Sequence, residues 1–335
     1  MRRQRLNLMG LLAAGAVVAA CGASPAVGQP ARGQARSETA NAVNAEPGPA
    51  PATAAFSVLV TAAAKRPCGV NARKSSYQHV MWVFMENESF ASIIGAPDAR
   101  YASALAHLCG LATNYDAITH PSLPNYLAAT GGTTAGITDD REPSVHPVYG
   151  ASIFSQLVAH AMTWRSYAES MPRPCDTVTS GLYAARHNPA VYYVRIRRAC
   201  ATDDVAMGSI SGGALHKALY SDALANFVFV TPNICDDAHS CPVQTGDRWL
   251  SAFCSMVFAS ATYRRGHLVV FVTWDEGNSD NRVPTIVAAP SVPSGTTSAI
   301  SFNHYSLLKT TEALLGLAPL GNASKATSMV AVFHL

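Results

Sequence analysis

Four short runs of apolar residues constrain the fold of this chain more than any other feature. Each has the length of a strand and stays apolar at successive positions, so both faces of the strand need cover. Parallel strands buried between two layers of helices have this pattern. The runs lie at residues 79–85 (HVMWVFM), 226–230 (NFVFV), 267–273 (HLVVFVT) and 284–289 (PTIVAA). They predict a mostly parallel sheet with helices on both faces.

Stretches with a helical pattern separate these runs. Their apolar residues recur three and four positions apart, as with Ile153 and Leu157, which is the period of an amphipathic helix. The expected helices lie at residues 102–109, 152–162, 214–224, 246–258 and 306–315. Strands that alternate with helices are typical of a doubly wound α/β fold. In such a fold the ligand binds beyond the carboxyl ends of the strands.

The first 21 residues predict an export signal. Arg2, Arg3 and Arg5 precede an apolar run of about fifteen residues, and small residues lead up to Cys21. A permanent membrane helix needs about 20 residues, so this run is too short to be one. Two interpretations of its end stay open. The sequence VAAC is either a lipobox, which places a lipid anchor on Cys21, or an ordinary cleavage site. Both predict a protein that is secreted or attached to the outer face of the cell membrane.

Composition excludes some classes of protein. The formal net charge of +3 falls to zero when the three leader arginines are removed, which argues against a nucleic-acid-binding surface. A hydrophobic share of 49% excludes wholesale disorder. Residues 22–76 are rich in Ala, Pro, Gly and polar residues and predict a low-complexity linker. We expect the folded domain at residues 77–320 and a C-terminal tail at 321–335.

Seven cysteines follow the leader, and export favours their oxidation. Because seven is odd, at least one cysteine has no intrachain partner. Zinc binding is the competing use, but the sequence has no C-x-x-C pair or matching His spacing. The expected pairs are Cys68–Cys109, Cys175–Cys200 and Cys235–Cys241, with Cys254 left as a buried thiol on an apolar helix.

Polar side chains follow the predicted strands, where the ligand is expected. Glu86 and Asn87 come directly after the first run and either face the site or cap the next turn, and the local sequence favours a cap. Asp275 and Glu276 come soon after the third of the four runs. Two adjacent carboxylates at the end of a buried strand repel each other unless a cation lies between them. We therefore interpret this second pair as metal ligands.

Residues 119–126 (THPSLPNY) predict the start of a short helix that ends at Gly131 and Gly132. Pro124 fits the first turn of such a helix. Ser122 then lies at the helix N-terminus, where free N–H groups and the helix dipole favour an anion. Its hydroxyl is either an N-cap alone or a nucleophile.

Three histidines are further candidates. His239 lies in a tight loop with two Asp residues, and a 235–241 disulfide would hold it rigidly. His304 precedes the last helix and is either a neighbour of its cap or part of the site. His187 has a cationic neighbour, Arg186, that would suit a phosphate.

The order and spacing of these motifs resemble the phosphoesterase family of the alkaline-phosphatase-like superfamily. That family contains bacterial acid phosphatases and the phosphatidylcholine-cleaving phospholipases C. Within it, the chain is most similar to the compact secreted acid phosphatases of mycobacteria, some of which are phosphatidylinositol-3-phosphatases. The matching stretches, spread over residues 77–317, are MENESF (85–90), THPSLPNY (119–126), TPN to DAH (231–239), TWDE (273–276) and NHYSLL (303–308).

The resemblance implies a role for each matching residue. Ser122 corresponds to a nucleophile that forms a phosphoserine, and Asn125 to an amide that donates to a phosphoryl oxygen. The residues that correspond to ligands of a divalent metal ion are Glu86, Asn87, Ser122, Asp275 and Glu276.

The resemblance gives the histidines less definite roles. His239 and His304 match positions that bind a second metal ion, contact the phosphate or protonate the leaving group. Ser240 departs from the family pattern, which usually has Asp there, so an acidic role falls to Asp236 or Asp237. These assignments predict hydrolysis of a small phosphate ester or a phospholipid head group.

A phosphomonoesterase of the acid phosphatase type is the expected function. The chain ends about eighteen residues after its last motif helix and carries no added domain of the kind that larger phospholipases have. Two alternatives stay open: a phospholipase C-type phosphodiesterase, and a surface lipoprotein without catalytic activity.

Overall fold

The computed structural model describes residues 66–70, 76–278 and 280–335. The expected leader, its Cys21 and most of the expected linker lie outside this part of the chain. A large sheet of eight strands runs through the described part, and a second sheet pairs β3 (Tyr115–Asp116) with β10 (Phe302–Asn303). From one edge to the other, the large sheet consists of β5 (Asp204–Ala206), β4 (Trp164–Ala168), β6 (Phe227–Thr231), β1 (His79–Met85), β7 (Leu268–Trp274), β8 (Thr285–Ala288), β2 (Gly110–Ala112) and β9 (Thr296–Ser298).

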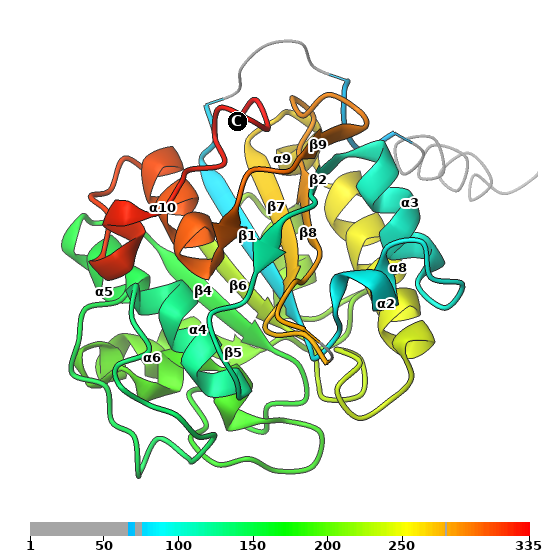
Figure 1. Cartoon of the computed structure of the whole chain (residues 1–335). Helices are drawn as coiled ribbons and strands as arrows, with labels where there is room; N and C mark the ends of the chain where they lie inside the picture. The colour runs from blue at the N-terminus through cyan, green and yellow to red at the C-terminus, as the bar shows by residue number, and fades with distance from the viewer. Residues whose placement is uncertain (1–65, 71–75, 279) are drawn as a thin grey trace, which may run out of the picture. The chain divides into compact units, whose positions relative to one another are not determined.

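Helices join these strands and cover both faces of the sheet (Figure 1). The α-helices are α2 (Phe90–Ile93), α3 (Arg100–Leu108), α4 (Ser122–Gly131), α5 (Ile153–Ala159), α6 (Arg197–Asp203), α7 (Ala214–Tyr220), α8 (Val243–Ala259), α9 (Ala261–Arg264) and α10 (His304–Leu314). Short 3-10 turns are η1 (Ala185–His187), η2 (Pro189–Tyr192), η3 (Val194–Ile196) and η4 (Gly321–Lys325). The predicted doubly wound α/β fold is confirmed.

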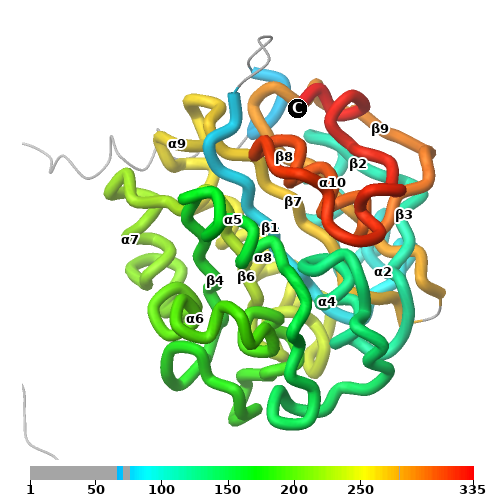
Figure 2. Tube along the Cα trace, turned by 90° about the vertical axis from the view of Figure 1, so that its left-hand side faces the viewer, coloured from blue at the N-terminus to red at the C-terminus, as the bar shows by residue number. Residues whose placement is uncertain are grey.

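The side chains of β1 alternate between the two helical layers, because successive residues of a strand point to opposite faces. The Trp82 indole donates to Thr311 of α10 at 2.9 Å, and the Phe84 ring packs against Tyr126 of α4. On the other face, Met85 lies against Gly246 of α8. Helices α4 and α10 therefore share one layer, which faces the viewer in Figure 2, and α3 packs on α8 in the other.

Strand directions agree with the prediction except at β8. Strands β5, β4, β6, β1 and β7 pair in parallel, whereas β8 pairs antiparallel with both β7 and β2. The run at 284–289 is buried on both faces as expected. An apolar pattern indicates that a strand is buried, but it does not indicate whether the strand runs parallel or antiparallel to its neighbours. This corrects the inference that each such run lies parallel to its neighbours. The four short strands β2, β4, β5 and β9 were not predicted.

The packed part of the chain extends beyond the expected limits of 77 and 320. Cys68 lies within the expected linker and is joined to Cys109 by a disulfide. Met329, Phe333 and Leu335 lie within the expected tail and are buried. A Cβ on Gly110 of β2 would come within 2.6 Å of the Phe333 ring, so the last residues complete the core beside this strand.

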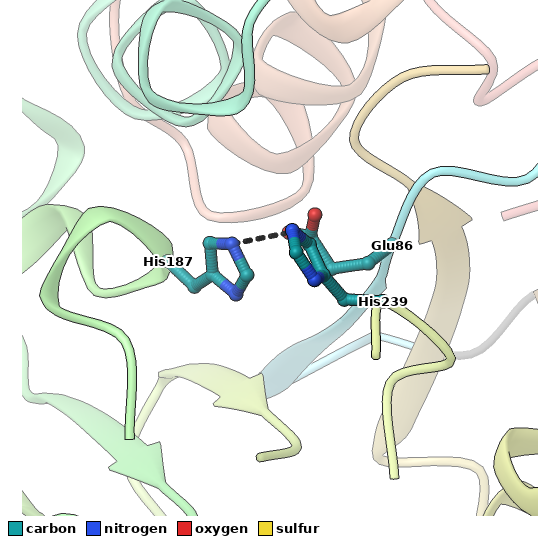
Figure 3. A group of neighbouring side chains, drawn as sticks. All are labelled: Glu86, His187 and His239. Atoms are coloured by element: carbon teal, nitrogen blue, oxygen red, sulfur yellow. Dashed lines mark ion pairs between the residues drawn. The ribbon is translucent and has the colours of Figure 1, made fainter. Parts of the chain in front are cut away.

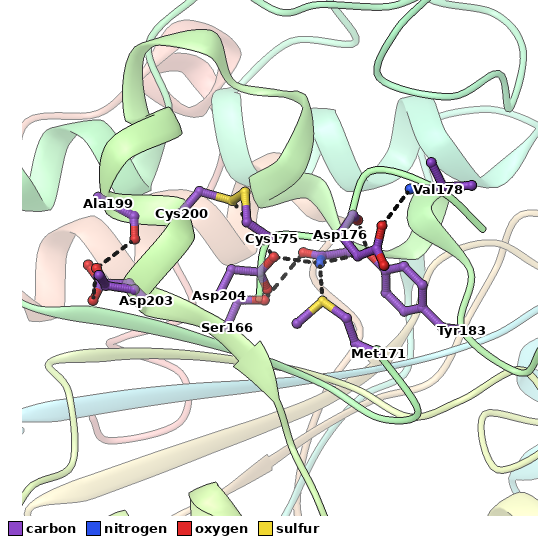
Figure 4. Close-up of a disulfide and its surroundings, with 12 residues drawn as sticks. Ser166, Met171, Cys175, Asp176, Val178, Tyr183, Ala199, Cys200, Asp203 and Asp204 are labelled. Carbon is purple, nitrogen blue, oxygen red and sulfur yellow. Dashed lines mark hydrogen bonds between the residues drawn. A yellow bond between two sulfur atoms is a disulfide. The ribbon is translucent and has the colours of Figure 1, made fainter. Parts of the chain in front are cut away.

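The three expected disulfides are confirmed, and Cys254 is a buried free thiol. The Cys175–Cys200 bridge ties the loop after β4 to α6 (Figure 4). Beside it, Asn188 donates to Asp204 at 2.8 Å, which fixes the chain directly after η1. Among the described helices, none is long and apolar enough to cross a membrane.

Candidate functional site

The site forms at the carboxyl edge of the sheet, where β1 and β7 end side by side. Met85 pairs in register with Trp274, so Glu86 and Asp275 emerge next to each other. The backbone N–H of Asp275 donates to Met85 O at 3.1 Å, and the N–H of Asn87 donates to Asp275 Oδ1 at 3.0 Å. Because both strands are parallel and central, their polar residues are brought together although they lie far apart in sequence.

Helix α4 directs two hydroxyl groups at the Glu86 carboxylate. The Ser122 hydroxyl donates to Glu86 Oε2 at 3.2 Å, and the Tyr126 hydroxyl donates to Oε1. Residues four apart lie on the same face of a helix, so Ser122 and Tyr126 reach the same group. Pro121 is at the N-cap position, and Ser122 is the first helical residue, so its hydroxyl does not act as the N-cap.

A second set of side chains meets Glu86 from the side of β6. The ring of His187 lies between two carboxylates, with Nε2 3.4 Å from Glu86 Oε1 and Nδ1 3.3 Å from Asp237 Oδ2. Glu86, His187 and His239 each offer an atom within 4.8 Å of the others. Figure 3 shows these three side chains together. His187 is 1% exposed and stacks on Tyr126. The structure thus places His187 and Asp237 close to Glu86, and their predicted catalytic roles stay predictions.

Arg186 determines which nitrogen of His239 carries a proton. Its Nη2 lies 3.0 Å from His239 Nε2, and a guanidinium has no acceptor, so Nε2 must accept. The His239 proton is then on Nδ1, which donates to Ser240 Oγ at 2.9 Å. Partial burial and Arg186 both lower the pKa of His239. In this arrangement His239 is neutral and holds no proton at Nε2 for a leaving group.

Four carboxyl groups share this space and have raised pKa values. Burial is the main cause, and the mutual repulsion of the carboxylates adds to it. Burial, followed by Asp275 and Asp237, raises the pKa of Glu86 well above its usual range. Burial raises the pKa of Asp237 to about 8, that of Asp275 to about 6 and that of Glu276 to about 8.

This group of residues fits a divalent cation. Asp275 Oδ2, Asp237 Oδ2 and both ring nitrogens of His187 are buried and make no hydrogen bond, although the His187 nitrogens lie 3.3 and 3.4 Å from carboxylate oxygens. Buried polar atoms without partners are rare in folded proteins, and carboxylate oxygens and imidazole nitrogens are ordinary ligands of divalent ions. A cation would also offset the repulsion among the carboxylates. The possible metal ligands form two groups. Ser122 and Asp275 lie on one side of Glu86, and His187 and His239 lie on the other.

The raised pKa values predict how stability depends on pH in protein freed of metal by a chelator. A carboxyl titrates near 4 in the unfolded chain, so between pH 6.5 and 8 the folded chain holds more protons through Asp237 and Glu276. Stability therefore falls as pH rises through this window. The histidines oppose this trend, because burial lowers the pKa of His187 and His304, so only the unfolded chain protonates them as pH falls towards 6.5. Their contribution fades above about pH 7, so the net fall in stability is expected from pH 7 to 8.

Thermal unfolding at several pH values tests this prediction. We expect the midpoint to fall from pH 7 to 8, to fall less in Asp237→Asn, and to rise on addition of a divalent cation. A midpoint that rises with pH over the same range in the chelated protein would contradict the prediction.

Asn125 makes its hydrogen bonds with groups of the chain itself. Its Oδ1 accepts from the N–H groups of Ile118 and Thr119 at 2.9 and 3.1 Å. Its amide nitrogen contacts the carbonyls of Thr119 and Pro121 and the Glu276 carboxylate at 2.8, 3.2 and 3.3 Å. Both amide hydrogens are thereby used within the chain. Asn125 thus holds the turn that precedes Ser122, and its role as a donor to phosphate stays a prediction.

His304 lies behind Asp275, and its predicted catalytic role stays a prediction. It is fully buried, its Nε2 lies 2.6 Å from the carbonyl of Asp275 and its Nδ1 lies 3.0 Å from the Tyr115 hydroxyl. A carbonyl accepts, so Nε2 carries the proton, and burial lowers the pKa of the ring to about 4. Neither nitrogen is left for a metal ion or a leaving group. Instead His304 fixes the backbone of Asp275 from behind.

The remaining predicted ligands lie at the margin of the group. Glu276 Oε2 lies 3.0 Å from His120 Nδ1, beside the turn before α4. Asn87 takes part through its backbone N–H and has a positive φ of 57°. Asp236 turns away from Glu86, because its carboxylate accepts from Asn233 at 2.8 Å. Of the two candidates for the acidic role left open by Ser240, Asp237 is the one that lies beside His187.

The sequence argument missed Tyr126 and Asp140. Tyr126 had a signal, because it lies four residues after Ser122 on the predicted helix. Asp140 had none. It lies in the long loop after α4, and its Oδ1 accepts from the N–H of Leu123 at 2.9 Å.

Comparison with known proteins identifies the family of this chain. Residues 96–318 match the phosphoesterase family. The chain belongs to this family. It is 34% identical over 257 residues to the phosphatidylinositol-3-phosphatase of Mycobacterium tuberculosis, which covers 75% of this chain and 81% of that protein. As a phosphoesterase, the chain is a hydrolase of phosphoric esters.

Fungal acid phosphatases are more distant relatives. The phosphate-repressible acid phosphatase of Penicillium chrysogenum is 29% identical over 265 residues, which cover 75% of this phosphoesterase and 62% of the fungal protein. This phosphoesterase therefore matches about three fifths of the fungal chain.

Solved structures show the same fold at low sequence identity. A protein of the alkaline phosphatase superfamily from Vibrio parahaemolyticus aligns with a TM-score of 0.51 at 12% identity, covering 80% of this chain and 77% of that one. A lipoteichoic acid synthase from Listeria monocytogenes aligns with a TM-score of 0.54 at 10% identity, covering 81% and 82%. At such identities the likeness extends to the fold alone.

Proposed function

We propose that this phosphoesterase is an exported enzyme that hydrolyses phosphate monoesters through a phosphoserine on Ser122. The observation that carries the proposal is the position of the Ser122 hydroxyl. It lies 3.2 Å from the Glu86 carboxylate, at the first residue of a ten-residue helix and beside buried carboxyl groups. A serine that reacts with phosphorus needs a group that accepts its proton and an environment that stabilises the negative charge that develops. The Glu86 carboxylate is positioned for the first role, and the start of the helix for the second.

Glu86 accepts the hydrogen of the Ser122 hydroxyl as the oxygen attacks phosphorus. Tyr126 holds the other oxygen of Glu86 and keeps the carboxylate in place. The developing charge on the phosphoryl oxygens is next to the N-terminus of α4, where the helix dipole favours anions. Attack in line with the leaving group gives phosphoserine and a free alcohol.

Glu86, Ser122 and Asp275 are the residues that would hold a divalent cation, with Asn87 and Glu276 beside them. When bound, such an ion polarises the phosphoryl group and favours the deprotonated form of the serine hydroxyl. Asp275 is kept in place by the Asn87 N–H and, through its carbonyl, by His304.

The second half of the reaction releases phosphate. Water attacks the phosphoserine, and Ser122 recovers its hydrogen from Glu86. His239 is the proposed source of the proton for the leaving alcohol, but its Nε2 accepts from Arg186. Before this nitrogen can donate, it must release Arg186 and take up a proton, which passes to the alcohol in the first step. The attacking water returns a proton to His239 in the second step.

The proposed location is outside the cytoplasm, either secreted or attached to the outer face of the membrane through a lipid on Cys21. The leader sequence and three disulfides support this proposal. The substrate is a small phosphate ester or a phospholipid head group. The name of the M. tuberculosis relative supports a phosphoinositide as one candidate.

Two assays test the proposal. We expect hydrolysis of nitrophenyl phosphate to exceed that of bis-nitrophenyl phosphate by at least about tenfold in kcat/KM, a difference of about 1.4 kcal/mol in transition-state stabilisation. Rapid acid quenching during turnover should trap phosphate on the peptide that contains Ser122. Preference for the diester would favour a phospholipase C-type activity instead. Absence of turnover on both esters, with the protein folded, would favour a non-catalytic surface lipoprotein.

A further inference from the structure

Arg186 lies at the edge of the carboxylate group and is reachable from solvent. Turn η1 carries it directly before His187, and its side chain is 21% exposed. Nη2 lies 3.0 Å from His239 Nε2, and Nε lies 3.9 Å from Asp140 Oδ2. Arg186 stays charged at any working pH. It therefore places a permanent positive charge next to the residues that surround Ser122.

Asp140 connects this charge to the start of α4. Its Oδ1 accepts from the backbone N–H of Leu123 at 2.9 Å, while its Oδ2 faces Arg186. Leu123 directly follows Ser122, so this N–H belongs to the first turn of the helix. A carboxylate from the chain thus lies between a helix N-terminal amide and a guanidinium, one residue from the proposed nucleophile.

These two donors are the kind that bind a phosphoryl group. Helix N-terminal amides and arginine side chains are recurrent partners of phosphate oxygens. Carboxylate and phosphoryl groups offer similar anionic oxygens, so they compete for the same donors. The charge of Asp140 also reaches the site, because it contributes to the raised pKa of Glu276 and acts on His239.

We propose that Arg186 and the Leu123 N–H bind two non-bridging oxygens of the substrate phosphoryl group, and that Asp140 occupies both donors until the substrate displaces it. The inference rests on the proposed function for the identity of its ligand and adds a specificity residue to it. A monoester carries one more non-bridging oxygen and about one more negative charge than a diester. Arg186 therefore favours monoesters.

The competing explanation is that Asp140 only caps α4. A cap lost by substitution lowers stability and leaves phosphate affinity unchanged or weaker. Displacement predicts the opposite for affinity, because removal of the competing charge leaves the donors to phosphate. The sign of the change in phosphate binding therefore decides between the two.

Calorimetric titration of the full-length protein with inorganic phosphate provides the test, since it needs no turnover. Arg186→Gln should weaken binding by about tenfold to a hundredfold, the usual effect of losing a charged hydrogen bond, and Arg186→Lys by less. Asp140→Asn should tighten binding by about threefold or more, because Asn can still accept from Leu123 but carries no charge. Thermal unfolding of each variant checks that it is folded.

Asp139 and Arg141 supply matched controls on the same loop. They form an exposed pair at 2.7 Å, and Asp139→Asn and Arg141→Gln should leave phosphate binding unchanged. The inference is overturned if Asp140→Asn binds phosphate no more tightly than the wild type, or if Arg186→Gln binds it equally well. If binding changes as expected but no ester is hydrolysed, the proposed function fails and this inference stands. The kcat/KM ratio of monoester to diester should fall in Arg186→Gln.

Discussion

Ser122→Ala is expected to lower kcat for nitrophenyl phosphate by at least about 10⁴-fold, the scale seen when a hydrolase loses its nucleophile. The hydroxyl is the group that the proposal places on phosphorus, and Glu86 has no other hydroxyl in position to replace it, since the Tyr126 oxygen already binds its second carboxylate oxygen. Steady-state kinetics, with rapid quenching for phosphoenzyme, measures the effect. The fold should persist, because Ser122 is not the N-cap of its helix.

Ser152→Ala is the matched control for this experiment. Its hydroxyl accepts from the Ser155 N–H and caps α5, away from the carboxylates. We expect a loss of about 1 kcal/mol in stability and unchanged kcat. Near-wild-type turnover by Ser122→Ala would overturn the assignment of the nucleophile.

Asp275→Asn is expected to lower kcat/KM by at least about a hundredfold and to reduce the divalent metal content of the purified protein. Changes to groups that only support a metal ligand cost about 10–100-fold, so loss of a direct ligand should cost no less. Asn is close in shape and can still accept from the Asn87 N–H at Oδ1, so the site geometry should survive. Metal analysis of the purified variant, beside kinetics, separates loss of the ion from loss of the fold.

Asp247→Asn controls for the removal of a carboxylate. Asp247 accepts from the N–H groups of Tyr101 and Ala102 at 2.8 Å each and so caps α3 from α8. Its substitution should affect stability and leave metal content unchanged. Equal metal content and activity in Asp275→Asn and the wild type would refute a cation site that includes Asp275.

The central strands of the fold could be predicted because a long run of apolar residues indicates a buried strand. Strand β1 was predicted with its bounds, and β6 and β7 within one residue. Strand β4 was missed because its residues WRSYA include Arg165 and Ser166, which break the apolar pattern. The direction of β8 was beyond the sequence, because antiparallel and parallel strands that are buried on both faces have the same composition.

The residues of the candidate site likewise include some that could be predicted from the sequence and some that could not. Glu86, Asp275 and Ser122 could be placed together because strand ends and a helix start define one edge of the sheet. The partners of Asn125 and His304 could not be predicted, since a buried amide or imidazole takes whatever group the tertiary structure brings to it. Arg186 and Asp140 depend on two long loops whose course no periodic pattern encodes.

The pairing of β1 with β7 also determines when catalytic competence arises during folding. Asn87 and Asp275 are 188 residues apart in the chain, and they meet only through this central pairing. Closing so large a loop costs entropy before any contact repays it, so we expect this pairing to form late. No partly folded species that lacks the pairing holds a complete site. The rate at which hydrolysis recovers after dilution from denaturant therefore measures when β1 pairs with β7. A circular dichroism signal of helix that returns earlier would report the formation of the flanking helices alone.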